Sequence, residues 1–457
     1  MTTPARTPLA LALVLIALAC SGRAEASPVL LADPAGTAIT RTDDPALPSD
    51  PAPPPRAVAP TEPATAARAA LPFRVAVANL VRDGSLSRRA AARALATMRE
   101  ATTVARRLRG RRRNELRAVL TNVRAITAAR MLTASRLPAL MLTVRRNREW
   151  WPHGRLLASG ERVRFRSSEL IWQYYPGQGL QIQWLGTFGR ANGLWAYGKN
   201  HELRLLLDEA RPLAADRAGG IAFEYLFRFG GGRPPWVSGL AQGTALSAYS
   251  RSYRRLHKTR YRGIARKLLG IFERPPPSGV LLKTAAGAHY LQYSYAPRLR
   301  IVNGFVQSLN GLLDYALLTG DPQGRTLFLA GERELRTTLH QFVTPSWSVY
   351  QLAGNSSTGP ASTLGYHVVL RDFLLGLCRR LKPGFNPLRP ATLEGQARAA
   401  QAPSGGAPPA QPEPGGVAPG TQPPPPTPPP TDADDRLPDP TPYCTTANEF
   451  SREIRAV

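Results

Sequence analysis

Paired helical segments between residues 185 and 385 constrain the fold more than any other feature of the sequence. The first member of a pair carries Gly, Ala and Ser on an apolar body, as in WVSGLAQGTALSAYSRSYRRL (236–256). The second member carries charge on one face, as in RYRGIARKLLGIFER (260–274). Inner helices that crowd together need small side chains, whereas outer helices face water. The pattern predicts a mainly α fold, an incomplete α/α toroid over 185–385, with a helical bundle as the alternative.

The segments outside the helical pairs differ in composition. Residues 150–184 alternate aromatic and β-branched residues with turn signals, which predicts short strands. A further hairpin is expected over SGVLLKTAAGAHYLQYSYAP (278–297), with its turn at Ala285 to Gly287. Residues 27–85 and 386–440 are rich in Pro, Ala and Gly and are predicted to be a disordered linker and a disordered tail. The C-terminal segment 441–457 is expected to dock back on the domain.

Residues 86–149 are a basic helical arm divided by Gly110 and Pro138. Its apolar residues recur at helical spacing, and arginine fills the other positions. We interpret the arm as helices packed on the main domain with solvated arginines. The alternative is a basic amphipathic arm that lies on an anionic surface.

The N-terminus has the pattern of a signal peptide over residues 1–26. Arg6 precedes the apolar run LALALVLIALA, and Ala24-Glu25-Ala26 suits cleavage before the next residue. This predicts a secreted or cell-envelope protein. Cys20 offers a lipoprotein alternative, but the residues before it make a poor lipobox. A mature chain keeps only Cys378 and Cys444, and the sequence leaves open whether they pair.

A net charge of +28 predicts attraction to polyanions such as nucleic acid, acidic polysaccharide or an anionic membrane. Arginine enrichment in a GC-rich genome is the competing explanation of the charge. A nucleic-acid partner is disfavoured because no recognition motif accompanies the charge and the chain carries an export signal. The sequence lacks zinc-ligand spacing, a phosphate loop and a Gly-x-Ser-x-Gly elbow, so no metal and no organic cofactor is expected.

Tyrosines cluster where loops meet the predicted helices. They are Tyr174, Tyr175, Tyr293, Tyr295, Tyr350 and Tyr366, and Arg298 and Arg300 lie near the middle of the set. Such a site suits proton transfer at the carbon α to a carboxylate, which needs charge neutralisation, a base on one face and an acid on the other. We expect the arginines to lower the tyrosine pKa values. The alternative is that each ring packs in the core and its hydroxyl bonds to backbone.

Four motifs in this region resemble the C-terminal domain of the D-glucuronyl C5-epimerases. They are WVSGLAQG (236–243), IVNGFVQSLNGLLDY (301–315), WSVYQL (347–352) and GYHVVLRDFLLGL (365–377), in the family's order and spacing. The resemblance implies an α/α toroid and catalytic roles for Tyr293, Tyr350 and Tyr366. Two positions depart from animal members: Gln292 replaces a glutamate and Ala353 replaces an arginine.

The sequence therefore predicts an exported uronosyl C5-epimerase that acts on glucuronic-acid-containing polysaccharide. Gln292 and Asn303 are expected to orient the sugar, and Arg298 and Arg300 to bind carboxylate or the polymer. The remaining candidate substrate-binding residues are Trp236, Gln242, Tyr175 and His367. Two alternatives remain, a non-catalytic acidic-polysaccharide-binding protein of the cell envelope and a polysaccharide lyase.

Overall fold

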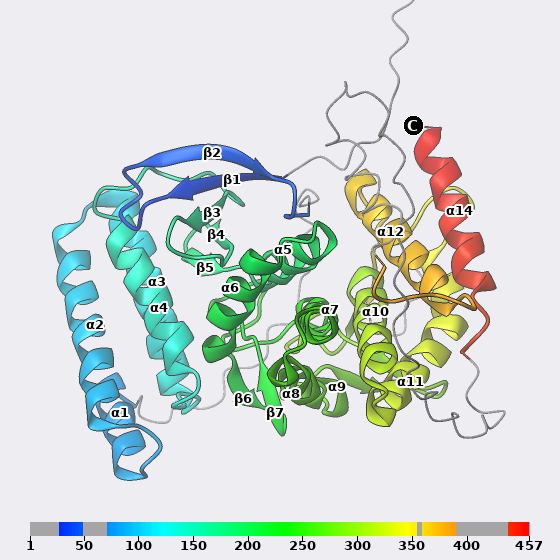
Figure 1. Ribbon diagram of the computed structural model, residues 1–457. Helices are drawn as coiled ribbons and strands as arrows, with labels where there is room; N and C mark the ends of the chain where they lie inside the picture. Colours follow the sequence, from blue (N-terminus) through cyan, green and yellow to red (C-terminus); the bar gives the residue numbers. More distant parts are fainter. Residues whose placement is uncertain (1–26, 49–70, 354–358, 390–436, 457) are drawn as a thin grey trace, which may run out of the picture.

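The computed structural model describes residues 27–48, 71–353, 359–389 and 437–456 of the chain. Four pairs of packed helices form the larger part of the molecule (Figure 1). Their first and second helices are α5 (Trp184–Ala196) and α6 (Asn200–Ala210), α7 (Gly239–Leu256) and α8 (Thr259–Leu268), α10 (Val302–Thr319) and α11 (Pro322–Thr338), and α12 (Leu364–Leu381) and α14 (Thr441–Arg455). The first helices contact one another in the order α5, α7, α10, α12, and each second helix packs on its own first helix. The fold is mainly helical, as predicted, while closure into a toroid stays a prediction.

Glycines explain the close approach of α7 and α10. A Cβ added to Gly311 would lie 2.2 Å from the carbonyl oxygen of Gly243, and one added to Gly243 would lie 2.8 Å from the Cα of Ser308. The two backbones therefore touch where a side chain would otherwise separate them. The prediction that the first helices need small residues is confirmed at this crossing.

The expected strand region over 150–184 is part of a five-stranded sheet. Its strands are β1 (Ser27–Ala32), β2 (Ile39–Asp44), β3 (Arg162–Phe165), β4 (Trp172–Tyr175) and β5 (Gly179–Ile182), in the order β2-β1-β3-β4-β5. Strands β1 and β3 are parallel, with Leu30 opposite Val163, and the other neighbours are antiparallel.

The prediction of a disordered linker over 27–85 is wrong for the part that the structure describes. Residues 27–48 contain β1 and β2, and residues 71–85 contain α1 (Phe73–Arg82). Strand β1 pairs with a partner more than a hundred residues away, so local composition could not reveal it. Residues 49–70 lie outside the described residues, as do residues 390–436 of the predicted C-terminal tail.

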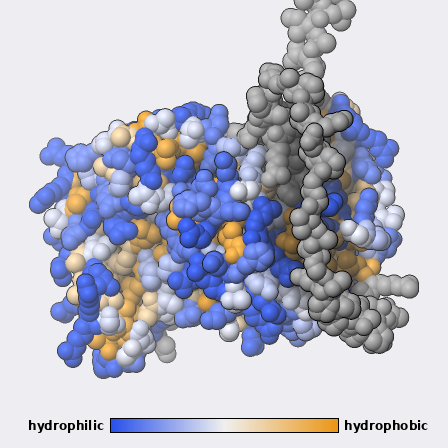
Figure 2. All heavy atoms as spheres, in the orientation of Figure 1, coloured by the Kyte–Doolittle hydropathy of each residue, from blue (hydrophilic) through white to orange (hydrophobic). Residues whose placement is uncertain are grey.

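The basic arm packs on the rest of the molecule. It consists of α2 (Arg88–Arg107), α3 (Gly110–Ala128) and α4 (Leu137–Trp150), and both α3 and α4 contact β5. The buried side of α2 is built mainly from alanine, and its exposed side carries arginine. Hydrophilic residues dominate the visible face of this part in Figure 2. The interpretation of the arm as packed helices is confirmed, and most of its arginines are solvated, except for the buried Arg136 and Arg146.

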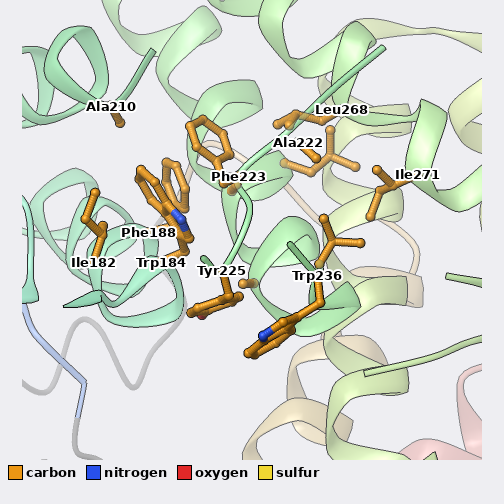
Figure 3. Packing of buried hydrophobic residues seen from close by; sticks show 14 of the residues in the cluster. Ile182, Trp184, Phe188, Ala210, Ala222, Phe223, Tyr225, Trp236, Leu268 and Ile271 are labelled. Atoms are coloured by element: carbon orange, nitrogen blue, oxygen red, sulfur yellow. The ribbon is translucent and has the colours of Figure 1, made fainter. Parts of the chain in front are cut away.

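The short elements complete the region of the helical pairs. They are β6 (Ala215–Arg217), β7 (Gly220–Ala222), α9 (Gly270–Glu273), β8 (Leu281–Lys283), β9 (Ala288–Tyr290), β10 (Leu299–Ile301) and β11 (Gln351–Ala353), with 3-10 turns at Arg211–Leu213 and Leu339–Phe342. Strands β8 and β9 form the predicted hairpin. Aromatic residues fill part of the hydrophobic core: Tyr225 stacks on Trp236 at 4.3 Å between ring centroids, while Trp184 packs on Phe223 at 4.9 Å (Figure 3).

The C-terminal segment docks as helix α14, in the place of an outer helix beside α12 (Figure 1). A disulfide joins Cys378 on α12 to Cys444 on α14, with a Cα–Cα distance of 5.1 Å. This settles the pairing that the sequence left open. Within the described ranges, none of the helices combines the length and the apolar character that crossing a membrane requires.

Candidate functional site

The predicted catalytic tyrosines meet where α10 and α12 begin. Strand β10 pairs with β11, with Ile301 opposite Gln351, and this pairing places Tyr350 beside the start of α10. The Asn303 side-chain N–H donates to the backbone carbonyl of Tyr366 at 3.4 Å, which joins the starts of the two helices. The rings of Tyr350 and Tyr366 lie 4.7 Å apart between centroids.

Tyr293 reaches the same place from the loop before β10. Its phenol lies close enough to raise the pKa of Tyr350, and the Gln292 side chain hydrogen-bonds both phenols. The structure thus brings together Tyr293, Tyr350, Tyr366, Gln292 and Asn303, which residue spacing and family resemblance had singled out.

Burial controls the chemistry of these phenols. It raises the pKa of Tyr293 to about 12, against an opposing hydrogen bond from Gln292. The pKa of Tyr350 is raised further, first by burial and then by the neighbouring Tyr293 and Tyr366 phenols. The expectation that arginine lowers the pKa is wrong for Tyr293 and Tyr350, whose pKa values are raised mainly by burial. Arg298 is exposed, and the half-buried Arg300 acts on His289, whose pKa is lowered to about 3 first by burial and then by this guanidinium.

Two buried amide oxygens have no hydrogen-bond partner among the described residues. They are Oε1 of Gln292 and Oδ1 of Asn303, on side chains that are 7% and 3% exposed. Buried polar atoms in native proteins nearly always have a partner, so these two acceptors need a donor from a ligand or from water. Both oxygens are enclosed in this structure, so a sugar hydroxyl reaches them only where the side chains around them shift.

The Asn-Gly-Phe sequence at the start of α10 has a physical reason at each position. Asn303 reaches α12, as described above. A Cβ on Gly304 would lie 2.7 Å from both the Cβ and the Oε1 of Gln292, so glycine makes room for the amide. Phe305 packs against His289, with 4.1 Å between ring centroids.

A layer of aromatic rings supports Tyr293 from behind. Tyr293 lies 5.3 Å from Tyr295, 5.7 Å from Trp236 and 6.0 Å from Phe229 between ring centroids. Trp236 is buried and donates its indole N–H to a backbone carbonyl, so it holds the tyrosine in place. Tyr175 lies half-buried at the edge of this layer, 6.0 Å from Phe229.

Two predicted substrate-binding residues have structural roles. Gln242 is fully buried and bonds both the N–H and the carbonyl of Phe223. His367 is also fully buried, and its imidazole packs against Trp347 and Phe450. Neither side chain has accessible surface in this structure, and their contact with substrate stays a prediction.

Sequence reasoning placed Tyr295 in the tyrosine cluster without giving it a role, and it did not include Phe229 or His289. The hydroxyl of Tyr295 is buried without a partner, and neither nitrogen of His289 has one among the described residues. Tyr295 alternates with Tyr293, and this spacing was a usable signal. The position of Phe229 depends on a loop sixty residues earlier, which the sequence does not connect to the site.

The carboxylates that a glycoside hydrolase would need are bound in ion pairs. Glu224 is buried between Arg136 and Arg217. Asp314 is buried against Arg251 and Arg380. Asp321 caps α11 and pairs with the Arg266 guanidinium. These three carboxylates stabilise the fold. In the described part of the chain, no group of three or more His, Cys, Asp or Glu residues is placed to hold a metal ion.

Comparisons with known proteins connect this site to one family. Residues 217–380 match the family model "D-glucuronyl C5-epimerase C-terminus". A D-glucuronyl C5-epimerase from Caenorhabditis elegans is 28% identical over 152 residues, which cover 30% of this chain and 24% of that protein. The match therefore spans about a quarter of the relative's length.

The similar solved structures are distant. An endo-β-1,4-glucanase from Acetobacter xylinum is 15% identical with a TM-score of 0.34, over 45% of this chain and 66% of that one. The Lin0763 protein from Listeria innocua is 13% identical with a TM-score of 0.31, over 62% and 82%. At these TM-scores the likeness carries no argument about fold or function.

Proposed function

Because residues 217–380 belong to the D-glucuronyl C5-epimerase C-terminal family, we propose that the protein is an exported uronosyl C5-epimerase. Its substrate class is glucuronic-acid-containing polysaccharide. The convergence of Tyr293, Tyr350 and Tyr366 around two unpaired amide oxygens is the observation that carries the proposal. Export rests on the signal-peptide pattern of residues 1–26 and on the disulfide, which suits an oxidising compartment.

The reaction needs a base on one face of carbon 5 and an acid on the other. The base breaks the carbon–hydrogen bond and takes the proton, the electron pair is delocalised into the adjacent carboxylate, and the acid returns a proton from the opposite face. Tyr366 is the least buried of the three tyrosines, so its phenolate is the one that water can solvate, and we assign it the base role. Tyr293 and Tyr350 stay protonated because burial raises their pKa values, and they serve as the acid.

Gln292 supports the acid side without moving a proton itself. A neutral amide cannot act as the carboxylate base that animal members have at this position. Its hydrogen bonds hold the phenols of Tyr293 and Tyr350, and its free Oε1 accepts from a sugar hydroxyl where the side chains around it shift. Arg298 and Arg300 are the nearby cations in sequence that would bind the carboxylates of the polymer.

A non-catalytic acidic-polysaccharide-binding protein is the second candidate. The absence of a carboxylate at Gln292 and of an arginine at Ala353 favours it, since both removals weaken proton transfer and leave the other candidate sugar-binding residues in place. A lyase would begin with the same proton abstraction and then expel the substituent at carbon 4.

Product analysis separates the three functions. The mature protein is incubated with unsulfated glucuronic-acid polymers, and the products are examined by NMR for iduronate and for unsaturated uronate. We expect iduronate in the presence of the protein and none with heat-inactivated protein. Unsaturated ends would show a lyase. Binding without either product on every polymer tested would overturn the enzyme proposal and leave the binding protein.

A further inference from the structure

His367 lies between the two chain segments that carry Tyr350 and Tyr366. It follows Tyr366 on α12, and its Nδ1 is 2.8 Å from the hydroxyl of Ser348, two residues before Tyr350. The Ser348 hydroxyl donates to the Oγ of Ser362 at 2.8 Å, so its lone pair is available to accept from the imidazole N–H. One side chain thereby links the strand segment of one tyrosine to the helix of the other.

The faces of this imidazole pack against two aromatic rings, one of them on helix α14. Trp347 stacks on the ring at 4.0 Å, and Phe450 of α14 packs on it at 4.5 Å between centroids. Nε2 of the same ring lies 3.2 Å from a carboxylate oxygen of Glu453, also on α14. The imidazole is fully buried, and Phe450 of α14 supplies part of its packing. No hydrogen bond joins Nε2 to Glu453 among the described residues, because a neutral ring that donates from Nδ1 has only a lone pair at Nε2.

Contacts independent of His367 hold α14 in place. The disulfide joins it to α12, and the Tyr443 hydroxyl donates to Glu332 of α11 at 2.7 Å. The Arg336 guanidinium of α11 donates to the backbone carbonyl of Asp439, just before the helix, at 2.8 Å. The last helix is thus anchored on two neighbouring helices before it contacts the histidine.

We propose that His367 is a positioning residue: clamped by α14, it fixes Tyr350 and Tyr366 relative to one another. The catalytic part of this inference rests on the proposed epimerase function, whereas the structural part does not. Proton transfer depends steeply on the placement of acid and base, and an error of about 1 Å costs up to ~100-fold in rate. A buried link between the segments that hold Tyr350 and Tyr366 is therefore expected to affect kcat more than KM.

The test compares His367→Leu, which keeps the volume but loses the hydrogen bond, with His367→Asn, which keeps a donor. His201→Leu, an exposed histidine on α6, is the matched control. Two readouts are taken: amide hydrogen exchange of residues 347–353, and the kcat and KM of uronate proton exchange. We expect His367→Leu to lose protection in this segment and to lower kcat about 10-fold or more, with KM within twofold. His367→Asn should recover much of both.

Unchanged protection of residues 347–353 and unchanged kcat in His367→Leu would overturn the inference. If that variant does not fold, Phe450→Leu on α14 loosens the packing on the imidazole from outside and must give the same loss of protection. If the unmodified protein shows no uronate exchange, the proposed function fails, and amide exchange alone decides the role of His367.

Discussion

At the scale of single residues, Gly304 shows how a short motif shapes the site. Replacing it by alanine places a Cβ against Gln292 and pushes that amide away from Tyr293 and Tyr350. We expect Gly304→Ala to lower kcat for uronate exchange at least about 10-fold, because the misplaced amide no longer orients the phenols. Thermal unfolding checks that the variant folds. Full activity would show that Gln292 has no part in catalysis.

Tyr293 provides a prediction about alkaline pH. Its pKa in the folded protein is about 12, above the ordinary value of 10.0, so folding disfavours the phenolate. The stability from this group is complete below pH 10 and is lost as the pH rises through about 12. Between pH 9 and pH 11 the unfolding free energy of the unmodified protein should fall by about 1.4 kcal/mol more than that of Tyr293→Phe, which lacks this ionisable group. Urea unfolding of both proteins at the two pH values measures the difference, and parallel losses would contradict it.

Local motifs predicted which residues lie together. The tyrosines, Gln292 and Asn303 stand at loop-to-helix junctions, and the structure brings them together. The sequence could not show that Gln242 and His367 are enclosed, because their partners are remote: the Gln242 amide bonds Phe223, and Phe450 of α14 packs on His367. A polar residue in a motif looks the same in sequence whether it faces a ligand or the core.

At the scale of elements, the contact of α7 with α10 depends on two glycines. Gly311→Ala would drive a methyl group into the backbone of Gly243, and overpacking of this kind costs about 1–3 kcal/mol. Gly263 on α8 is the matched control, because no atom lies within 4 Å of the place that an alanine methyl group would occupy, so alanine there should be neutral or stabilise by up to ~1 kcal/mol. Chemical denaturation of both variants measures the contrast, and equal effects would refute the close-packing argument.

The helical pairs were predictable because a periodicity of small and charged residues is local. The small residues of the first helices allow close contact between Gly243 and Gly311, and the charged faces of the second helices lie outside. Strands β1 and β2 were not predictable in the same way. Their Pro- and Ala-rich surroundings suggested disorder, while the parallel pairing of β1 with β3 is a long-range interaction.

At the scale of the whole molecule, the disulfide fastens the C-terminal helix across a long segment. Cys378 and Cys444 are separated by 66 residues, and closing a loop of that size restricts the unfolded chain by about 4 kcal/mol in the entropy account. Replacing both cysteines by serine should lower the unfolding free energy by about 2–4 kcal/mol. Denaturant unfolding with and without reductant checks this: the reductant should destabilise the unmodified protein and leave the variant unchanged. A reductant effect of equal size on both would contradict the assignment.

The central claim is that Tyr366 removes the carbon-5 proton of a uronate, and deuterium incorporation tests it most directly. The unmodified protein, Tyr366→Phe and the control Tyr253→Phe, a half-buried tyrosine on α7, are incubated with a glucuronic-acid polymer in D2O. Loss of the carbon-5 proton signal is followed by NMR. We predict loss with the unmodified protein and with Tyr253→Phe, and none with Tyr366→Phe. Exchange that persists in Tyr366→Phe at the unmodified rate would contradict the account.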